Sequence, residues 1–230
     1  MSKSIILDAG HGGSDVGATG NGLLEKNLTL KMTNYQYKRL KELGAKVQRT
    51  RSGDQTVSST KRTQIVRQSG ADVCISNHFN AFNGKARGVE TIHSYLAKST
   101  FAKNLANTIV KTSGLPLRRV FTRRLNNGKD YYYMHRQTGS VRTVIIEYGF
   151  IDNKQDMNYF KNESNFYKVG EAIVKEICKE IGLSYKPKKE SNQSSSLYKV
   201  QTGAFKDKKN AQQLEKKLKK DGYESFITKE

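Results

Sequence analysis

The 230-residue sequence has no tryptophan, only two prolines and two cysteines, and no long apolar run. A helix that spans a bilayer needs roughly 20 apolar residues, so we expect no membrane-spanning segment. The N-terminus lacks the basic-then-apolar pattern of a secretory signal, and we expect a protein made in the cytoplasm without one. Cys74 lies in a strand-like run and Cys178 in a helical pattern. Both are expected to be buried free thiols, which makes a disulfide framework improbable.

Acidic residues are scarce relative to basic ones, 21 against 41, which gives a formal net charge of +20. Such a balance favours a polyanionic partner, either nucleic acid or an anionic surface. The densest aromatic cluster, Tyr131 to Tyr133, lacks the glycine and basic context of an RNA-recognition strand. We therefore expect no nucleic-acid partner. The charge then belongs either to a generally basic surface or to a face that binds anionic polymers.

Short apolar runs alternate with helical patterns over residues 1–183. Such runs, bounded by turn signals, are typical of buried strands in a largely parallel sheet. We predict an α/β unit with a twisted, mostly parallel sheet and helices on both faces. Segment 117–133 is not assigned to a strand or a helix. The predicted strands are 5–8, 45–50, 72–77, 88–95 and 142–147, and the predicted helices are 25–43, 59–69, 97–113 and 164–181.

The composition changes in the last quarter of the chain. Residues 184–196 are polar and almost free of aliphatic side chains, which predicts a flexible linker. Residues 197–230 predict a small C-terminal βαβ unit. Domains below roughly 40 residues usually need a metal, a disulfide or a partner. The unit's predicted strands are 197–205 and 223–228, on either side of helical spacing at Ala211, Leu214 and Leu218.

Three predicted strands end on residues that can bind metal or move protons. His11 follows the first strand, His78 follows the strand over 72–77, and Glu147 ends the strand over 142–147. Ligands of such sheets bind outside the carboxyl ends of the strands. With Glu25 nearby at the start of a helix, this set can hold a catalytic zinc ion, which takes three protein ligands and leaves one position for water.

Each of these residues also has an ordinary structural explanation. Glu25 suits the positive end of a helix dipole, and a histidine at a strand end can be purely structural. The candidate ligands are dispersed along the chain, unlike those of an H-E-x-x-H helix, so their spacing alone is a weak signal. From the residues alone, both explanations stay open.

Several motifs occur in a fixed order over residues 3–182. They are Ile5 to Gly17, Leu24-Glu25-Lys26-Asn27-Leu28, Thr50-Arg51 followed by Asp54, Ser76-Asn77-His78-Phe79-Asn80-Ala81, Gly88-Val89-Glu90 and Glu147-Tyr148-Gly149-Phe150-Ile151. In this order they resemble the zinc-dependent N-acetylmuramoyl-L-alanine amidases of the Amidase_3 type. One departure is Asn77, because the family usually has a branched apolar residue before the second histidine.

The resemblance implies that His11, Glu25 and His78 bind Zn²⁺ and that Glu147 is the essential catalytic carboxylate. It implies hydrolysis of the amide between N-acetylmuramic acid and L-alanine in bacterial peptidoglycan, and hence lysis of the cell wall. An enzyme of this kind that lacks a secretory signal and acts on the wall after release would be a phage endolysin or a sporulation autolysin. The opposing hypothesis is a non-catalytic cell-wall- or polyanion-binding protein on the same fold.

Other polar residues are weaker candidates. His135 and Arg136 lie in a region that borders the cleft in the family, so we predict contact with substrate; an ordinary surface histidine is the alternative. His93 alternates along a strand and is expected to be structural. Arg51 and Arg62 match basic positions that support the family's loop fold, although a solvated helix charge explains Arg62 equally well.

The tail start Tyr198-Lys199-Val200-Gln201-Thr202-Gly203-Ala204-Phe205 resembles a SPOR repeat. Modules of this family bind peptidoglycan glycan strands, so Tyr198, Gln201 and Phe205 are predicted to contact the wall, and anionic wall polymers are a possible second partner. A full module has about twice this length. The missing half predicts an exposed strand edge and apolar face, and therefore a homodimer through residues 197–230. The alternative is that the tail docks on its own catalytic domain.

Overall fold

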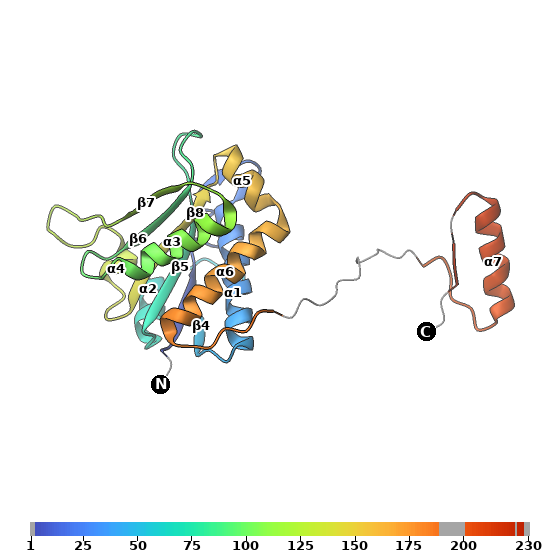
Figure 1. Cartoon of the computed structure of the whole chain (residues 1–230), viewed down its shortest axis with the longest axis horizontal. Helices are drawn as coiled ribbons and strands as arrows, with labels where there is room; N and C mark the ends of the chain where they lie inside the picture. The colour runs from blue at the N-terminus through green and yellow to red at the C-terminus, as the bar shows by residue number, and fades with distance from the viewer. Residues whose placement is uncertain (1–2, 189–200, 224, 228–230) are drawn as a thin grey trace. The chain divides into compact units, whose positions relative to one another are not determined.

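The computed structural model describes residues 3–188, 201–223 and 225–227. Six strands form the central sheet in the order β4-β1-β5-β8-β6-β7 (Figure 1). All neighbouring pairs are parallel except β8 and β6, which are antiparallel. The bounds are β1 (Ile5–Ala9), β4 (Val47–Arg49), β5 (Val73–Asn80), β6 (Val89–His93), β7 (Leu117–Phe121) and β8 (Arg142–Phe150).

The reversal at β6 was not predicted, and the connection that leads to it explains the direction. Parallel strands need a crossover of a dozen or more residues. Only residues 81–88 join β5 to β6, and they contain no helix, so β6 runs back across the sheet. Two short strands, β2 (Thr19–Gly20) and β3 (Leu23–Leu24), form a separate antiparallel pair.

Helices cover both faces of the sheet, as predicted. On one face the large hydrophobic core is completed by α1 (Glu25–Glu42), α3 (Thr100–Ser113), α5 (Lys154–Lys161) and α6 (Glu163–Ile181). On the other face α2 (Ser59–Gln68) and α4 (Tyr133–Arg136) pack over a smaller core. Cys74 lies in the smaller core and Cys178 in the larger one, and both thiols are buried and free.

Helix boundaries follow local capping. The Asn153 side chain accepts hydrogen bonds from the backbone of Gln155 and Asp156 and starts α5, a helix that the sequence analysis missed. Asn162 caps α6 in the same way. Gly114 and Gly182 end α3 and α6 in the left-handed conformation, which glycine adopts without steric cost.

The chain divides into two compact units, residues 1–186 and 187–230. Tyr185 and Lys186, which the sequence assigns to the linker, belong to the first unit. The Tyr185 hydroxyl donates to Glu171 Oε1 at 2.9 Å, and Arg39 Nη2 donates to the carbonyl of Lys186 at 3.1 Å. Most of the predicted linker lies outside the described residues.

In the second unit the described structure is one helix, α7 (Lys208–Lys220). The helix of the predicted βαβ unit is thus present. The described parts of its two predicted strands, 201–205 and 225–227, are not strands. A strand needs a partner for its backbone hydrogen bonds, and the described residues 201–223 and 225–227 contain no strand that could pair with these segments.

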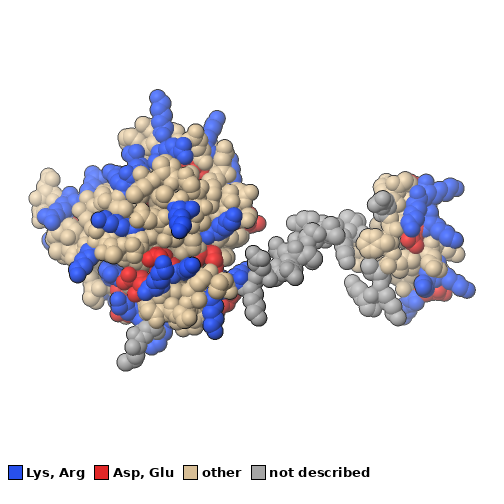
Figure 2. All heavy atoms as spheres, in the orientation of Figure 1, with Lys and Arg blue, Asp and Glu red and all other residues tan. Residues whose placement is uncertain are grey.

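Basic side chains are spread over the visible face of the first unit and over α7, and the fewer acidic ones include a group on the lower part of the first unit (Figure 2). The net charge is therefore not confined to one segment. In the part of the chain that the structure describes, every helix is too short or too polar to cross a bilayer.

Candidate active site

The candidate site lies at one edge of the sheet, where four elements meet. His11 follows β1, Glu25 is the first residue of α1, and His78 and Glu147 lie near the ends of β5 and β8. The Cα atoms of His78 and Glu147 are paired between the two parallel strands, and Glu147 is paired in turn with Glu90 of β6. Paired residues point to the same face of a sheet, so these three side chains share one face.

Two imidazoles converge on one carboxylate. His11 Nε2 lies 3.0 Å from Glu25 Oε2, and His78 Nδ1 lies 2.9 Å from Glu25 Oε1. The three potential ligand atoms lie within 4.8 Å of one another. Metal–ligand distances of about 2.1 Å in tetrahedral geometry place ligand atoms about 3.4 Å apart. The nitrogen–oxygen donor set and its spacing therefore fit a metal ion such as zinc.

The backbone orients Glu25. Its carboxylate accepts hydrogen bonds from the Ala18 N–H at 2.8 Å and the Phe79 N–H at 3.0 Å. Burial opposes ionisation of Glu25, but its hydrogen bonds to His11 and His78 outweigh burial and hold the Glu25 pKa below its usual value. An ionised carboxylate is the form that binds metal.

Asp15 fixes the ring of His11. The Asp15 carboxylate lies 2.9 Å from His11 Nδ1 and leaves Nε2 to face Glu25. Burial lowers the His11 pKa, but the bonds to Glu25 and Asp15 outweigh this effect and raise it overall. A carboxylate behind a metal-binding histidine commonly sets its tautomer and orientation.

Two glycines leave room for the imidazoles. A Cβ atom on Gly10 would lie 2.2 Å from His78 Cε1, and one on Gly17 would lie 2.7 Å from both Glu25 Oε2 and the His11 ring. The backbone of His11 has a φ of 59°. This left-handed conformation is energetically unfavourable for a residue that has a side chain. The surrounding contacts must therefore impose this geometry.

Buried arginines supply those contacts. Arg51 Nη2 donates to the carbonyl of Gly10 at 2.9 Å, and Arg62 Nη2 donates to the carbonyl of His11 at 2.8 Å. Arg62 also forms a fully buried ion pair with Asp8 at 2.6 Å. Both arginines thus support the loop, and the alternative of a solvated charge is wrong for Arg62, whose exposed fraction is 2%.

Glu147 is placed differently from the three candidate ligands. Its Oε2 atom is buried and has no hydrogen-bond partner among the residues that the structure describes. Burial, followed by the charges of Glu25 and Glu90, raises the Glu147 pKa well above its ordinary value. A carboxyl group with a raised pKa and a free oxygen is suited to exchanging protons.

Residues 5–179 match the family described as N-acetylmuramoyl-L-alanine amidase, Amidase_3. The chain belongs to this amidase family. Residues 174–230 match the SPOR domain, a match that begins within α6. These findings confirm the resemblance that the sequence motifs indicate, and the activity of the family is peptidoglycan amide hydrolysis.

Similar proteins span most of the amidase chain. The sporulation-specific N-acetylmuramoyl-L-alanine amidase of Bacillus subtilis is 32% identical over 97% of this chain and 83% of its own length. The catalytic domain of CwlV, an N-acetylmuramoyl-L-alanine amidase from Bacillus (Paenibacillus) polymyxa, superposes with a TM-score of 0.70 at 26% identity, covering 79% of this chain and 99% of that domain. Cwp6 from Clostridium difficile gives a TM-score of 0.74 at 33% identity, covering 79% of this chain and 29% of that longer protein.

Asn77, the departure from the family pattern, is part of a buried polar network in the amidase. Its Nδ2 donates to Thr33 Oγ1 and Gln36 Oε1, both at 2.9 Å, and its Oδ1 accepts from the Tyr148 hydroxyl at 2.8 Å. The polar side chain replaces an apolar contact with hydrogen bonds between β5, α1 and β8. It leaves His78 in contact with Glu25.

His135 and Arg136 lie on α4. Both ring nitrogens of His135 are buried and lack hydrogen-bond partners among the described residues. Burial is the main cause that lowers the His135 pKa to about 4. Arg136 Nη1 donates to the carbonyls of Asp130 and Tyr131. Contact of His135 and Arg136 with substrate stays a prediction.

His93 is half-buried at the end of β6, and its Nδ1 donates to the carbonyl of Ser94 at 2.9 Å. Gln201 and Phe205 of the tail are exposed. Tyr198 lies outside the described residues, and wall contact through these three tail positions also stays a prediction.

Sequence reasoning missed three residues of the site. Asp15 follows His11 by four residues, a spacing that could have indicated a histidine-orienting carboxylate. Glu90 could not be placed, because the antiparallel pairing of β6 with β8 was not predicted. Tyr132 lies in segment 117–133, to which the sequence assigned no strand or helix. Burial, then the charge of Glu147, raises the Tyr132 pKa above its ordinary value.

Proposed function

We propose that the amidase cleaves the amide between N-acetylmuramic acid and L-alanine with a zinc ion held by His11, Glu25 and His78. The observation that carries this proposal is the convergence of two imidazoles and one carboxylate near a second carboxyl group, that of Glu147, whose Oε2 has no hydrogen-bond partner among the described residues. When bound, zinc lowers the pKa of water to about 7 and polarises a carbonyl group.

Glu147 is the proposed proton carrier. Its free Oε2 takes a proton from the attacking water and later gives it to the nitrogen of the leaving L-alanine. The leaving amine is thereby released in neutral form while the acyl carbon receives the water oxygen. Asp15 keeps His11 Nε2 directed at the metal position, and Arg62 keeps the His11 backbone in its left-handed conformation.

The SPOR match indicates peptidoglycan binding by the C-terminal region. We propose that Tyr198, Gln201 and Phe205 contact the wall and that the protein acts at the cell wall. Its net charge of +20 supports additional affinity for anionic wall polymers. The alternative of a non-catalytic wall-binding protein is disfavoured by the complete set of candidate ligands and by Glu147.

We also propose that the tail forms a homodimer through residues 197–230. No described side chain of α7 is buried, and large apolar side chains nearby are exposed. Two such halves can complete one sheet around a two-fold axis, the commonest symmetry of protein dimers. The exposed side chains are Phe205, Tyr223, Phe226 and Ile227.

Mass spectrometry of digested peptidoglycan tests the proposed reaction. Cleavage at the proposed bond releases peptides with a free L-alanine amine and leaves glycan strands with intact lactyl carboxyl groups. Products with new reducing sugar ends, or with cuts within the stem peptide, would refute it.

A further inference from the structure

A second polar feature lies two strands away from the proposed catalytic carboxyl, in the order β8, β6, β7. A groove of about 380 Å³ is lined by Arg118, Arg119, Arg123, Asn80, Phe82 and Phe150. Arg118 and Arg119 belong to β7, Asn80 ends β5, and Phe150 ends β8. The groove is therefore at the same sheet edge as the candidate ligands, and none of those ligands lines it.

A β-bulge gives the groove two neighbouring guanidinium groups. Leu117 pairs with Val89, whereas Arg119 pairs with Glu90, so Arg118 is the extra residue. Bulges redirect side chains and are frequent beside active sites. Here the Nε atoms of Arg118 and Arg119 both donate to Glu90 Oε1 at 2.7 Å. Regular pairing would place these two side chains on opposite faces of the sheet.

The groove has unused hydrogen-bond donors and an excess of positive charge. Glu90 is 1% exposed, while the Arg118 and Arg119 side chains are 38% and 51% exposed. Among the described residues, each of these arginines uses only its Nε in a hydrogen bond, which leaves the Nη groups free. Arg123 is exposed, stacks on Tyr131 at 3.8 Å, and pairs with no described carboxylate.

We propose that this groove binds a carboxylate of the stem peptide and thereby positions the scissile amide. The inference rests on the proposed amidase function and adds a substrate subsite to it. Arginine forks bind carboxylates through paired charge-assisted hydrogen bonds. Phe82, whose exposed fraction is 74%, provides an apolar wall for the peptide.

The distance from the catalytic carboxyl favours the peptide over a wall polymer. Glu147 pairs with Glu90, and Glu90 pairs with Arg119. Two strand spacings separate Glu147 from Arg119, about 10 Å. An extended peptide covers this distance in about three residues. The second stem residue, D-glutamate, is linked through its side chain and keeps a free α-carboxylate; a meso-diaminopimelate at the third position carries another.

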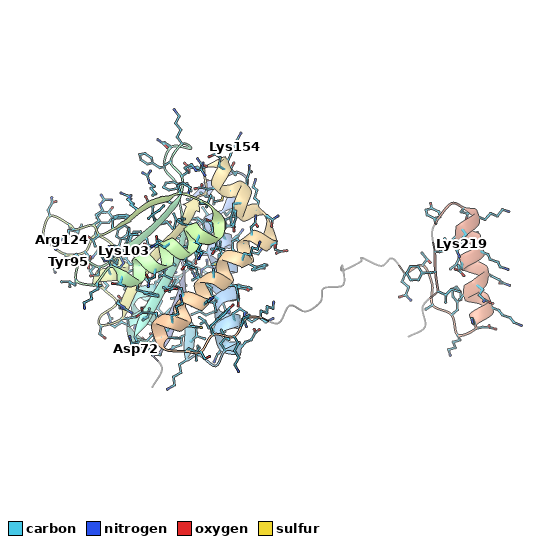
Figure 3. The ribbon with its side chains drawn as sticks, viewed as in Figure 1. Asp72, Tyr95, Lys103, Arg124, Lys154 and Lys219 are labelled. Carbon is cyan, nitrogen blue, oxygen red and sulfur yellow. The ribbon has the colours of Figure 1, made fainter. Side chains whose placement is uncertain are left out.

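The chain offers a closely matched pair of variants. Arg123 and Arg124 are adjacent, both are exposed, and each stacks on a tyrosine at 3.8 Å, Arg123 on Tyr131 and Arg124 on Tyr95. Arg124 does not line the groove; it is labelled beside Tyr95 in Figure 3. Arg123→Gln and Arg124→Gln therefore remove the same charge and a similar stacking contact, but only the first changes the groove.

Calorimetry on the full chain carrying Glu147→Gln, which stops turnover, measures the Kd of a soluble muropeptide. We expect Arg123→Gln to weaken binding about tenfold, Arg124→Gln to change it less than twofold, and Arg123→Lys to restore part of the loss. Three ligands locate the recognised group: the muropeptide with free D-glutamate, the same with that carboxylate amidated, and one with lysine in place of meso-diaminopimelate.

One of the two altered ligands, the amidated or the lysine-containing muropeptide, should bind the Arg123→Gln variant and its parent with the same Kd. The carboxylate that this ligand lacks is then the one that the groove binds. The proposal is overturned if both glutamine variants weaken binding equally, if all three ligands respond alike, or if Arg123→Gln reduces affinity only for phosphate-bearing wall polymer. A failure of the proposed reaction can be distinguished from a failure of the proposed subsite. In the first case the wild-type chain would leave the muropeptide uncut, whatever Kd the calorimetry gives.

Discussion

Removal of the Arg62 guanidinium should destabilise the amidase unit strongly. Arg62 and Asp8 form an ion pair in which both side chains are buried. Arg62→Met fills similar space but leaves the Asp8 carboxylate with only the hydroxyls of Thr50 and Ser76, each at 2.7 Å. Breaking a buried pair by removing one partner costs about 3–5 kcal/mol. At about 2–4 °C per kcal/mol for a unit of this size, Tm should fall by about 10 °C.

Urea unfolding of the full chain, followed by circular dichroism, measures this loss. Arg67→Met is the matched control, because Arg67 lies on the same helix, is exposed, and makes one hydrogen bond, to the carbonyl of Gln137; it should cost less than about 0.5 kcal/mol. The double variant Asp8→Asn with Arg62→Met should lose less than Arg62→Met alone, because no buried charge remains unpaired. Equal losses for Arg62→Met and Arg67→Met would refute the reasoning.

The same pair predicts a pH dependence. Burial raises the Asp8 pKa, but Arg62 and the hydroxyl donors outweigh it and hold the folded-state pKa below the usual value. A depressed pKa contributes stability that is present above the unfolded pKa of about 3.9 and lost as pH falls through the folded pKa. Arg62→Met removes the largest cause that lowers the Asp8 pKa, so we expect this pKa to rise and low pH to relieve that variant. The difference in unfolding free energy between wild type and Arg62→Met should therefore shrink between pH 7 and pH 4, and a constant difference would contradict this account.

Three further predictions concern the metal, the tail and assembly. Glu147→Ala should abolish lysis and keep about one zinc per chain by metal analysis, whereas His11→Ala or His78→Ala should lose the zinc; loss of zinc in Glu147→Ala would show that the roles are wrongly divided. Deletion of residues 187–230 should leave hydrolysis of soluble muropeptide intact and reduce retention in a wall pull-down, with salt weakening the ionic part of what remains; equal retention would assign the affinity to the first unit. Light scattering should find the full chain dimeric and a 1–186 chain monomeric, and a monomeric full chain at tens of micromolar would exclude the dimer.

The sequence was sufficient to predict the positions of those site residues that follow local patterns. His11, His78 and Glu147 were placed at one sheet edge because short apolar runs precede each of them, and Glu25 because it begins a helix. The roles of Arg118 and Arg119 depend on a bulge and on the register of β7 against β6. No local pattern encodes that pairing, because register is decided by packing between strands.

The tail shows the same limit. Alternation over 197–205 predicted a strand, but the described part, 201–205, is not one, because a strand forms only when another chain segment accepts its hydrogen bonds. Helical spacing, in contrast, predicted α7 correctly, because a helix satisfies its own backbone groups.

Four paired residues form one row across neighbouring strands: His78, Glu147, Glu90 and Arg119. This row limits where residues can be inserted into or deleted from the chain. Side chains alternate between faces along a strand, so one residue inserted in β8 before Glu147 would turn that carboxyl toward the opposite helices. Insertions and deletions within these strands are thus selected against even where they leave the core intact. Length variation among descendants of this sequence should accumulate instead in the connections, such as 81–88 and 122–132, which can lengthen while the row stays in register.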